Sequence, residues 1–428
     1  MNPTTLPRFF EKSVSYASRS STIILLLIVS LFPLSSKATE KAEVIHWWVS
    51  GSEKAALQVV IDDFESKGNT WIDTPVKASY QAKSVAITRM LDRTPPTMVQ
   101  WHAGVALKEL HQAQLTRNIN ELAAKEKWQS VIHPLIWEQI SINNEIVAIP
   151  MTMHGSNWMW TNKRILDELE IEVPKTWDQF FQIAPVIQKA GYIPLALGGQ
   201  VWQERALFTN IILATGGPEF YRSVIIDHDP VALVSDQMIK AFDTFGKLRQ
   251  FTDENSPKRG WAETTKLVID GKAAFQIMGD WVKGEFTQAG LTPGTDYICS
   301  QSPGTSENYV IVSDAFVVTA TEDISSRNAQ NALAKTMMDP EIQRRFNILK
   351  GSIPPRTDVP TKGFDPCARM AMEKIAGGVT LLEGFNMANA GIIANIISDN
   401  IGTYWTTPEI TPKKATQVLA QQIKEINL

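Results

Sequence analysis

Short apolar runs and amphipathic segments alternate along the chain between residues 43 and 150. Residues 44–49 form an apolar run that predicts a strand, and residues 53–67 carry apolar side chains at helical spacing until Gly68 ends the pattern. This repeated alternation predicts a mainly parallel sheet with helices on both faces. Further strands are predicted at residues 76–80 and 97–101, and further helices at residues 85–91, 105–115 and 119–127.

The second half of the chain contains longer elements. Residues 146–160 form one extended run, which predicts a single strand that crosses between two lobes. Thr176 is predicted to cap a helix that runs to about residue 189. Strands are also predicted at residues 273–281 and 309–319, and helices at residues 328–346 and 415–426. No flexible linker separates these elements, so any lobes are joined by short ordered segments.

Two adjacent tryptophans stand where the first predicted strand meets its helix. Ligands of open α/β sheets bind outside the carboxyl ends of the strands, which is where Trp47, Trp48 and Glu53 lie. Aromatic faces pack on the C–H face of a sugar and a carboxylate accepts from its hydroxyls, so this pattern indicates a site for a hydroxyl-rich ligand. The alternative is a pair of core rings, with Glu53 favoured by the helix dipole. Because neighbouring strand residues face opposite sides, one core cannot hold both rings.

Polar and aromatic residues also gather at the ends of other apolar runs. The chain has 13 tryptophans but only 7 tyrosines. Asp314 lies inside an apolar run, where a carboxylate is either paired or faces a ligand, and the pattern leaves both alternatives open. The sequence contains none of the common motifs for serine hydrolases, zinc proteases or nucleotide binding. Together these clusters favour a ligand surface: Trp47 and Trp48, Trp101 and His102, Trp202, and Asp280 with Trp281.

Composition indicates a globular protein of two or three domains. The chain has 428 residues, of which 44% are hydrophobic and 20% charged, with a formal net charge of -4. Without a basic footprint, nucleic acid is excluded as an expected partner. The only cysteines, Cys299 and Cys367, are expected to form a disulfide if the chain is exported. A metal pair is the alternative, but no histidine cluster accompanies them, so no metal site is predicted.

The first 38 residues have the pattern of a secretory signal peptide. A basic stretch precedes an apolar run at residues 22–34, and small residues around Ala38 offer a cleavage site. This run is shorter than the roughly 20 residues that a spanning helix needs. An uncleaved N-terminal anchor is the alternative. No cysteine lies in the leader, so we expect a free protein in the periplasm.

An ordered series of segments resembles the solute-binding proteins of ATP-driven sugar importers. The resemblance is to the maltodextrin-binding-like group and, within it, to the glucose/mannose-binding branch, and it covers essentially the whole chain after the leader. Each segment alone is weakly specific, but their order is a specific signal. The matching segments are HWWVSGSE from His46, PMTMHGSNWMW from Pro150, PKTWDQFF from Pro174, GGQVWQ from Gly198, MGDWVKGEF from Met278 and KGSIPPR from Lys350.

This resemblance implies a periplasmic-binding-protein type II fold. Such a fold has two α/β lobes joined by three crossings, here near residues 150–155, 308–312 and 354–358, with the ligand cleft between the lobes. It implies a sugar ligand, a membrane ABC permease as partner, a monomer, no cofactor and no enzymatic activity. The implied division is a signal peptide at residues 1–38, an N-terminal lobe at residues 39–153 plus 310–355, and a C-terminal lobe at residues 154–309 plus 356–428.

The resemblance also implies which residues contact the sugar. Two positions depart from the family pattern: Val312 replaces an asparagine, and the segment at residues 383–386 lacks the family's pocket histidine. These departures leave glucose, another monosaccharide or a short oligosaccharide as alternatives. Two other functions stay open, a sugar-sensing input protein for a membrane receptor and a secreted carbohydrate-active enzyme using Glu53 with Asp280 or Asp314. The implied contact residues are Trp47, Trp48, Glu53, His102, Trp281, Asp314 and Lys350.

Overall fold

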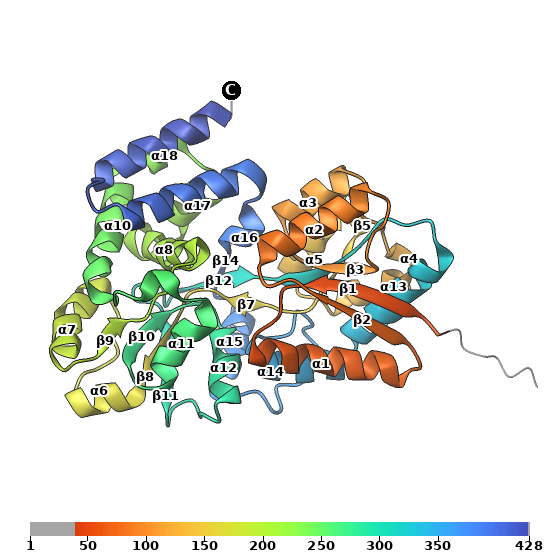
Figure 1. Ribbon diagram of the computed structural model, residues 1–428, viewed down its shortest axis with the longest axis horizontal. Coiled ribbons are helices and arrows are strands. Elements are labelled where there is room, and N and C mark those ends of the chain that lie inside the picture. The colour runs from red at the N-terminus through yellow and green to blue at the C-terminus, as the bar shows by residue number, and fades with distance from the viewer. Residues whose placement is uncertain (1–38, 427–428) are drawn as a thin grey trace, which may run out of the picture. The chain divides into compact units, whose positions relative to one another are not determined.

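The computed structural model of the protein describes residues 39–426, which form a mixed α/β fold (Figure 1). The predicted signal peptide, residues 1–38, lies outside the described residues. Within residues 39–426, no helix is both long enough and apolar enough to cross a membrane.

Two principal sheets organise the described chain. One has the order β2-β1-β3-β13-β6 and the other the order β11-β8-β10-β9, while a three-stranded sheet has the order β14-β12-β7. The strands are β1 Lys41–His46, β2 Thr70–Pro75, β3 Met98–His102, β4 Ser141–Ile142, β5 Glu145–Ile146, β6 Ala148–Pro150, β7 His154–Gly155, β8 Trp158–Asn162, β9 Ile193–Leu195, β10 Ala273–Ile277, β11 Tyr297–Gln301, β12 Asn308–Val312, β13 Asp314–Val318 and β14 Thr380–Glu383.

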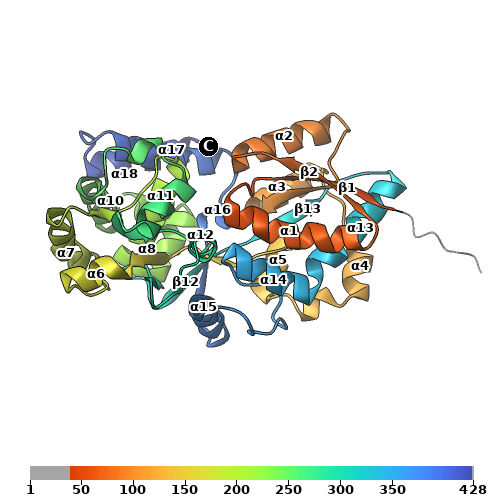
Figure 2. The same cartoon turned by 60° about the horizontal axis from the view of Figure 1, so that its bottom comes forward.

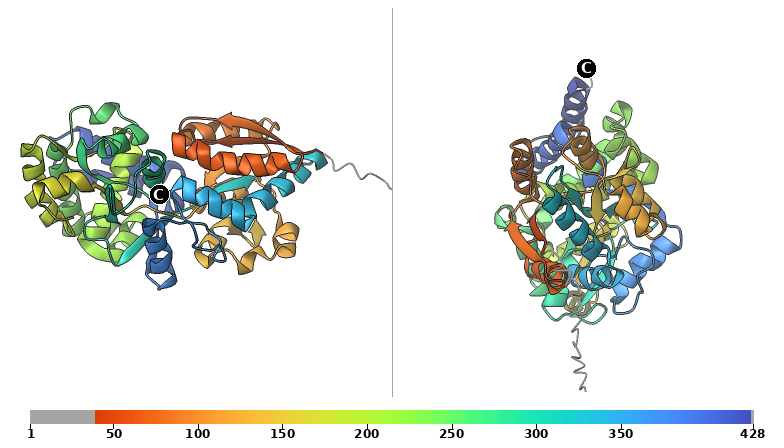
Figure 3. Two further views of the ribbon diagram at one scale, coloured as in Figure 1. Left: turned by 90° about the horizontal axis from the view of Figure 1, so that it is seen from below. Right: turned by 90° about the vertical axis from the view of Figure 1, so that its right-hand side faces the viewer.

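Helices surround both principal sheets, and the yellow-to-green segments gather at one end of the view from below while the red-to-orange segments gather at the other (Figure 3). They are α1 Gly51–Ser66, α2 Ser79–Leu91, α3 Val105–Gln112, α4 Asn120–Lys125, α5 Pro134–Ile140, α6 Lys163–Leu169, α7 Trp177–Lys189, α8 Val201–Ile225, α9 Pro230–Leu233, α10 Asp236–Lys247, α11 Trp261–Ile269, α12 Val282–Gln288, α13 Ile324–Met338, α14 Pro340–Lys350, α15 Pro366–Ala376, α16 Phe385–Ala388, α17 Gly391–Thr406 and α18 Pro412–Ile426.

Two clusters of buried side chains form the hydrophobic core. One is built on β1, β3, β6 and β13 together with α1, α13 and α14, and it extends to Trp158 and Trp160 of β8 and Tyr297 of β11. The other is built on β9 and β10 together with α7, α8, α10, α17 and α18. Helices α1 and α14 pack side by side, as Figure 2 shows.

In the first sheet four of the five strands, β2, β1, β3 and β6, run in the same direction, so the predicted mainly parallel sheet is confirmed; the prediction missed the one strand, β13, that runs against them. In the first sheet β1 pairs parallel with β2 and β3, but β13 pairs antiparallel with both β3 and β6. In the second sheet β8 pairs antiparallel with β10 and β11. The antiparallel strands are β8 and β13. The chain enters each of them after it has crossed from the other principal sheet. Local alternation of strand and helix does not encode this long-range return.

Several predicted elements differ from the observed ones at their boundaries. The second strand is β2 at Thr70–Pro75, not residues 76–80, because it pairs with β1 over its whole length. The long run at residues 146–160 is divided into β6, β7 and β8, and the run at residues 309–319 is divided at Ser313 into β12 and β13. The predicted helix at residues 328–346 is two helices, because Asp339 caps α14 and Pro340 starts it. In each case the break transfers the chain to a different sheet or helix axis.

Three segments that are distant in the sequence meet between the two principal sheets. Strand β7 pairs with β12, and Met153 forms a bridge with Ile353. These contacts bring together residues 153–155, 311–312 and 353, which lie within or next to the three crossings that the resemblance implies.

The predicted disulfide between Cys299 and Cys367 is confirmed. It joins β11 to α15 with a Cα–Cα distance of 6.1 Å and closes a loop with a sequence separation of 68. Replacing both cysteines by serine is expected to lower the free energy of unfolding by about 2–4 kcal/mol, because the unfolded chain then loses a long-loop constraint. Urea unfolding of the oxidised protein and of the double variant measures this difference, and equal stability would contradict it.

Candidate functional site

The turn between β1 and α1 is held by its own polar groups. Ser50 is the N-cap of α1, and the Glu53 carboxylate accepts hydrogen bonds from the backbone N–H groups of Val49 and Ser50 at 3.0 and 3.1 Å. The backbone N–H of Trp47 donates to the Gln100 side chain on β3 at 2.9 Å. One Glu53 oxygen thus completes a capping box in the first turn of α1. The other oxygen lies 3.5 Å from the Lys350 Nζ.

Strand pairing brings His102 and Asp314 together. His102 ends β3 and Asp314 begins the antiparallel β13, and the two residues are register partners. The His102 Nε2 lies 3.5 Å from an Asp314 oxygen, while its Nδ1 lies 3.1 Å from the Lys83 Nζ. Both residues are at the carboxyl end of β1 and β3, where ligands of α/β sheets bind.

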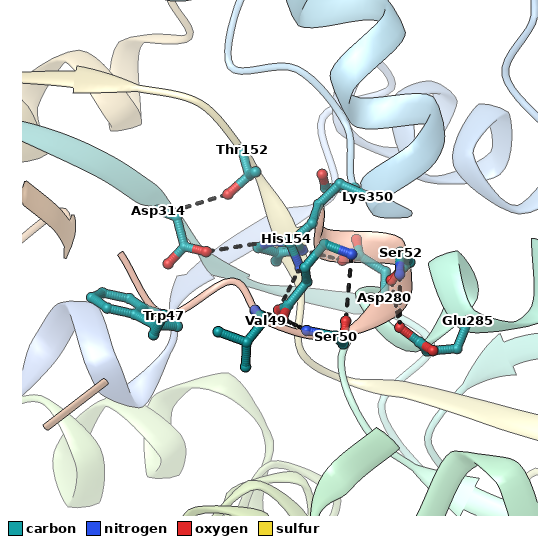
Figure 4. Close-up of polar contacts among 12 residues, drawn as sticks. Trp47, Val49, Ser50, Ser52, Thr152, His154, Asp280, Glu285, Asp314 and Lys350 are labelled. Carbon is teal, nitrogen blue, oxygen red and sulfur yellow. Dashed lines mark hydrogen bonds and ion pairs between the residues drawn. The ribbon is translucent and has the colours of Figure 1, made fainter. Parts of the chain in front are cut away.

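A second histidine, His154, links two buried carboxylates (Figure 4). Its Nδ1 lies 2.5 Å from an Asp280 oxygen, and its Nε2 lies 3.7 Å from the other oxygen of Asp314. The second Asp280 oxygen accepts from the backbone N–H of Gly155 at 2.8 Å. His154 is 2% exposed. The Asp280–His154–Asp314 chain therefore joins the turn after β10 to the start of β13 in the five-stranded sheet.

The two histidines carry opposite pKa shifts. Burial and the neighbouring Lys83 ammonium lower the pKa of His102 to about 3, so this ring is neutral and accepts from Lys83. The pKa of His154 is raised because the Asp280 carboxylate outweighs the effect of burial. Contacts with both histidines lower the pKa of Asp314 to about 2 against the effect of burial. Asp314 is thus ionised. It is paired with two histidines, as expected under the alternative of a paired carboxylate.

Trp47 and Trp48 have unequal environments. Trp48 is 1% exposed, and its ring contacts Phe316 and Phe346 at centroid distances of 5.4 and 5.0 Å. Trp47 is half-buried, and its ring centroid lies 5.2 Å from that of His102. His102 in turn lies 3.5 Å from Asp314, so His102 links the Trp47 ring to this carboxylate. Both residues follow the end of β1, so the alternation expected for neighbouring strand residues does not itself cause the difference.

Trp281 contacts the charged side chains of the site through His154. It is the N-cap residue of α12, and its ring contacts His154 edge to face at 5.4 Å and Trp202 at 6.2 Å. Lys350, the last residue of α14, is 2% exposed and has its Nζ 5.8 Å from the Trp48 ring centroid. Trp47, Trp281, His102, Asp314 and Lys350 are thus connected through contacts, with Trp48 behind Lys350.

Elements attached to the two sheets contact each other around this cluster. The Ser52 hydroxyl, in the first turn of α1, donates to the Glu285 carboxylate of α12 at 2.6 Å. The Gln139 side chain of α5 donates to Glu383 of β14 at 2.8 Å. Gly104 has φ 106°, and an added Cβ there would lie 2.3 Å from the Met387 carbonyl oxygen. The two parts of the fold are therefore closely apposed in this structure.

A surface cavity of about 460 Å³ lies elsewhere, beside α4 and α5. Asn120, Lys127 and Trp137 line it, and no predicted binding residue does. Among residues 39–426, no group of three or more histidine, cysteine, aspartate or glutamate side chains is arranged to hold a metal ion.

His102 is expected to make stability fall on the acid side. Its folded pKa of about 3 lies below the ordinary 6.5, so between these values only the unfolded state binds a proton, and acid favours unfolding. His154 has a raised pKa, so its contribution is complete below its unfolded pKa and is lost as pH rises through the folded value. His102→Gln should therefore lose less stability than the natural chain between about pH 6.5 and about pH 4. Urea unfolding at both pH values measures this, and identical losses would contradict it.

The sequence was compared with known families and proteins. A family model described as bacterial extracellular solute-binding protein matches residues 49–332. The chain is 35% identical over 393 residues to a probable sugar-binding periplasmic protein of Rhizobium meliloti, covering 90% of this chain and 94% of that protein.

The chain belongs to the bacterial extracellular solute-binding proteins. This solute-binding protein is also 37% identical to a probable sugar-binding periplasmic protein of Brucella melitensis, covering 82% of this chain and 83% of that protein. A chitin oligosaccharide binding protein of known structure matches it with a TM-score of 0.80 at 17% identity, covering 91% of this chain and 99% of that one. The predicted type II fold is confirmed by this likeness.

Sequence reasoning missed three basic residues at or near the candidate site of this solute-binding protein: His154, Lys83 and Arg205. His154 lies inside the PMTMHGSNWMW segment, but nothing local distinguishes it from a core histidine. Lys83 and Arg205 lie on helices α2 and α8 at positions with no motif of their own. A helical-face argument offers a partial signal for Arg205, since it lies three residues after Trp202 and therefore on the same face of α8.

Proposed function

We propose that this solute-binding protein captures a sugar in the periplasm and delivers it to a membrane ABC permease. The observation that carries the proposal is the half-buried Trp47 ring, which lies 5.2 Å from His102 at the carboxyl ends of β1 and β3, while His102 lies 3.5 Å from the ionised Asp314. A ring face next to a carboxylate and an imidazole suits the mixed apolar and hydroxyl surface of a sugar. The names of the Rhizobium and Brucella relatives support the same ligand class.

We assign the binding roles from the contacts of each side chain. Trp47 and Trp281 offer ring faces, Asp314 accepts from hydroxyls, and His102 donates. Glu53 and Lys350 form a buried ion pair at 3.5 Å, which orients the Lys350 ammonium as a donor. Trp48 does not contact the sugar directly, because its ring is covered by Phe316 and Phe346. It instead supports the Lys350 ammonium, which lies 5.8 Å from its ring centroid.

We further propose that the protein works as two lobes that close on the sugar. The N-terminal lobe is residues 39–153 plus 310–355, and the C-terminal lobe is residues 154–309 plus 356–428. The contacts of Ser52 with Glu285 and of Gln139 with Glu383 cross between these lobes and support a closed arrangement. Residues 1–38 act as the signal peptide, and the exported protein is a monomer. Hinge closure of this kind is a common response of binding proteins to their ligands.

The sugar need not be glucose or mannose. Val312 stands where the resembling family has an asparagine, and its side chain packs at the Gly384 position, where an added Cβ would lie 2.5 Å from Val312 Cγ2. The loss of an amide there removes a hydrogen-bonding group from the pocket, which changes the discrimination between hydroxyl patterns. A related saccharide therefore remains within the proposal.

Calorimetric titration of the purified protein with monosaccharides and short oligosaccharides tests the proposal. We expect saturable binding of at least one sugar and recovery of that sugar chemically unchanged. Consumption of the sugar would support a carbohydrate-active enzyme instead. Stimulation of a receptor in membranes, without sugar uptake through a co-expressed permease, would support the sensing alternative.

A further inference from the structure

Two cations without a carboxylate partner lie beside the proposed sugar site. Lys83 on α2 has its Nζ 3.1 Å from His102 Nδ1, 4.7 Å from the Trp101 ring centroid and 5.8 Å from the Trp47 ring centroid. Arg205 on α8 shares a helix face with Trp202, whose ring contacts Trp281. Among residues 39–426, no aspartate or glutamate oxygen lies within 4.0 Å of either cation.

Every contact recorded for Arg205 is with a neutral group. Its guanidinium lies 4.1 Å over the Phe385 ring, and its two terminal nitrogens donate to Ser398 Oγ at 2.7 Å and Asn386 Oδ1 at 2.8 Å. Phe385 and Asn386 belong to the segment that lacks the resembling family's pocket histidine. A guanidinium from α8 thus lies against the segment that departs from the family pattern. An arginine has five N–H donors, so further donors remain for a ligand.

Lys83 and Arg205 also act on each other electrostatically. Burial lowers the pKa of Lys83 to about 8; the Arg205 charge contributes to this shift, and Asp314 and Glu109 oppose it. Burial lowers the pKa of Arg205 to about 10. The same two cations lower the pKa of His102. Two half-buried positive charges, one from each proposed lobe, therefore act on each other, and neither has a carboxylate of the described residues within ion-pair distance.

The other charges of the cluster offset only one of these two cations. Lys350 faces Glu53, and His102 is neutral, while a protonated His154 between Asp280 and Asp314 leaves this trio with one net negative charge. A neutral sugar would therefore leave one positive charge of Lys83 and Arg205 without a counter-charge when the lobes close. An anion between them would balance that charge and form charge-assisted hydrogen bonds, which are about twice as strong as neutral ones.

We propose that the sugar carries an anionic group, a carboxylate or a phosphate, which binds between Lys83 and Arg205. This inference rests on the proposed function, because it names the class of sugar that the same site takes. The Trp47 and Trp281 rings pack on the sugar ring, and the anionic substituent points toward α2 and α8.

Calorimetric titration with matched sets of sugars tests the inference. Each set holds a neutral hexose, its uronic acid and its 6-phosphate, with glucose, galactose and mannose as parents. In at least one set we expect the acid or the phosphate to bind about tenfold tighter than the hexose, or more. The tighter of the two anions identifies the group. If the hexose binds as tightly as both anions in every set that binds, the inference is overturned and the proposed function stands. If no sugar in any set binds, the inference is overturned, and the titration with short oligosaccharides decides the proposed function separately.

Charge-removing variants locate the anion. Lys83→Gln and Arg205→Gln should each reduce the preference for the anion by about tenfold, whereas Arg205→Lys should retain most of it. Lys108→Gln, which removes the same charge from an exposed side chain of α3, should leave the preference unchanged. Thermal unfolding of each variant checks that it folds. A preference that survives in folded Lys83→Gln and Arg205→Gln would overturn the assignment of these two residues.

Discussion

Replacing Trp48 by alanine is expected to lower the free energy of unfolding by about 3–5 kcal/mol. Its ring is 1% exposed and lies against Phe316 and Phe346, so truncation leaves a large cavity between β13 and α14. The same change removes the aromatic face 5.8 Å from the Lys350 ammonium. Urea unfolding followed by circular dichroism measures the loss.

The matched control is the neighbouring tryptophan. Trp47→Ala removes a half-buried ring, so it should lower the free energy of unfolding clearly less than Trp48→Ala does. It should nevertheless weaken sugar binding, because it removes a ring face that packs on the sugar. If Trp47→Ala and Trp48→Ala destabilise the protein equally, the unequal roles assigned to the two rings are wrong.

Replacing His154 by glutamine is the second change with a large expected effect, a loss of about 3–5 kcal/mol at neutral pH. Glutamine can donate one hydrogen bond, but it cannot neutralise the Asp280 carboxylate 2.5 Å away or the Asp314 carboxylate 3.7 Å away. Two carboxylates that are 4% and 5% exposed would then share one site without the imidazole that lies between them. Urea unfolding of the variant and the natural chain gives the difference.

Two further variants separate this effect from a general effect of histidine loss. His111→Gln removes a histidine that lies 3.8 Å from Glu145 at the surface, where an ion pair contributes about 1 kcal/mol or less. Adding Asp280→Asn to His154→Gln should recover part of the lost stability, because it removes one of the two uncompensated charges. A loss in His111→Gln as large as in His154→Gln would contradict the account.

Local sequence patterns predicted the individual elements better than their connections. Ser50, Gly51 and Glu53 form a capping sequence whose partners are all within a few residues, so the start of α1 could be read from the chain. The break at Ser313 could not, because it depends on β12 pairing with β7 and β13 pairing with β3, more than 150 residues away in the sequence. The mixed direction of the sheets has the same origin.

In the candidate site, too, local patterns identified some residues and missed those whose role depends on long-range contacts. Trp47, His102 and Asp314 were found because each stands at an end or an interruption of an apolar run. His154 was missed because its role comes from Asp280 and Asp314, which meet it only in the folded chain. Arg205 was missed for the same reason, since its partners Asn386 and Ser398 lie 181 and 193 residues away. A long-range charge network leaves no local period in the sequence.

Thermal unfolding in the presence of sugars tests the central claim most directly. A ligand at about 100 times its dissociation constant adds about 2.7 kcal/mol to the free energy of unfolding, which raises the midpoint measurably. We predict that at least one neutral or anionic sugar raises the midpoint of the natural protein and that the shift is lost in Asp314→Ala. A panel of sugars that leaves the midpoint unchanged, or a shift that persists in folded Asp314→Ala, would contradict sugar binding at this site.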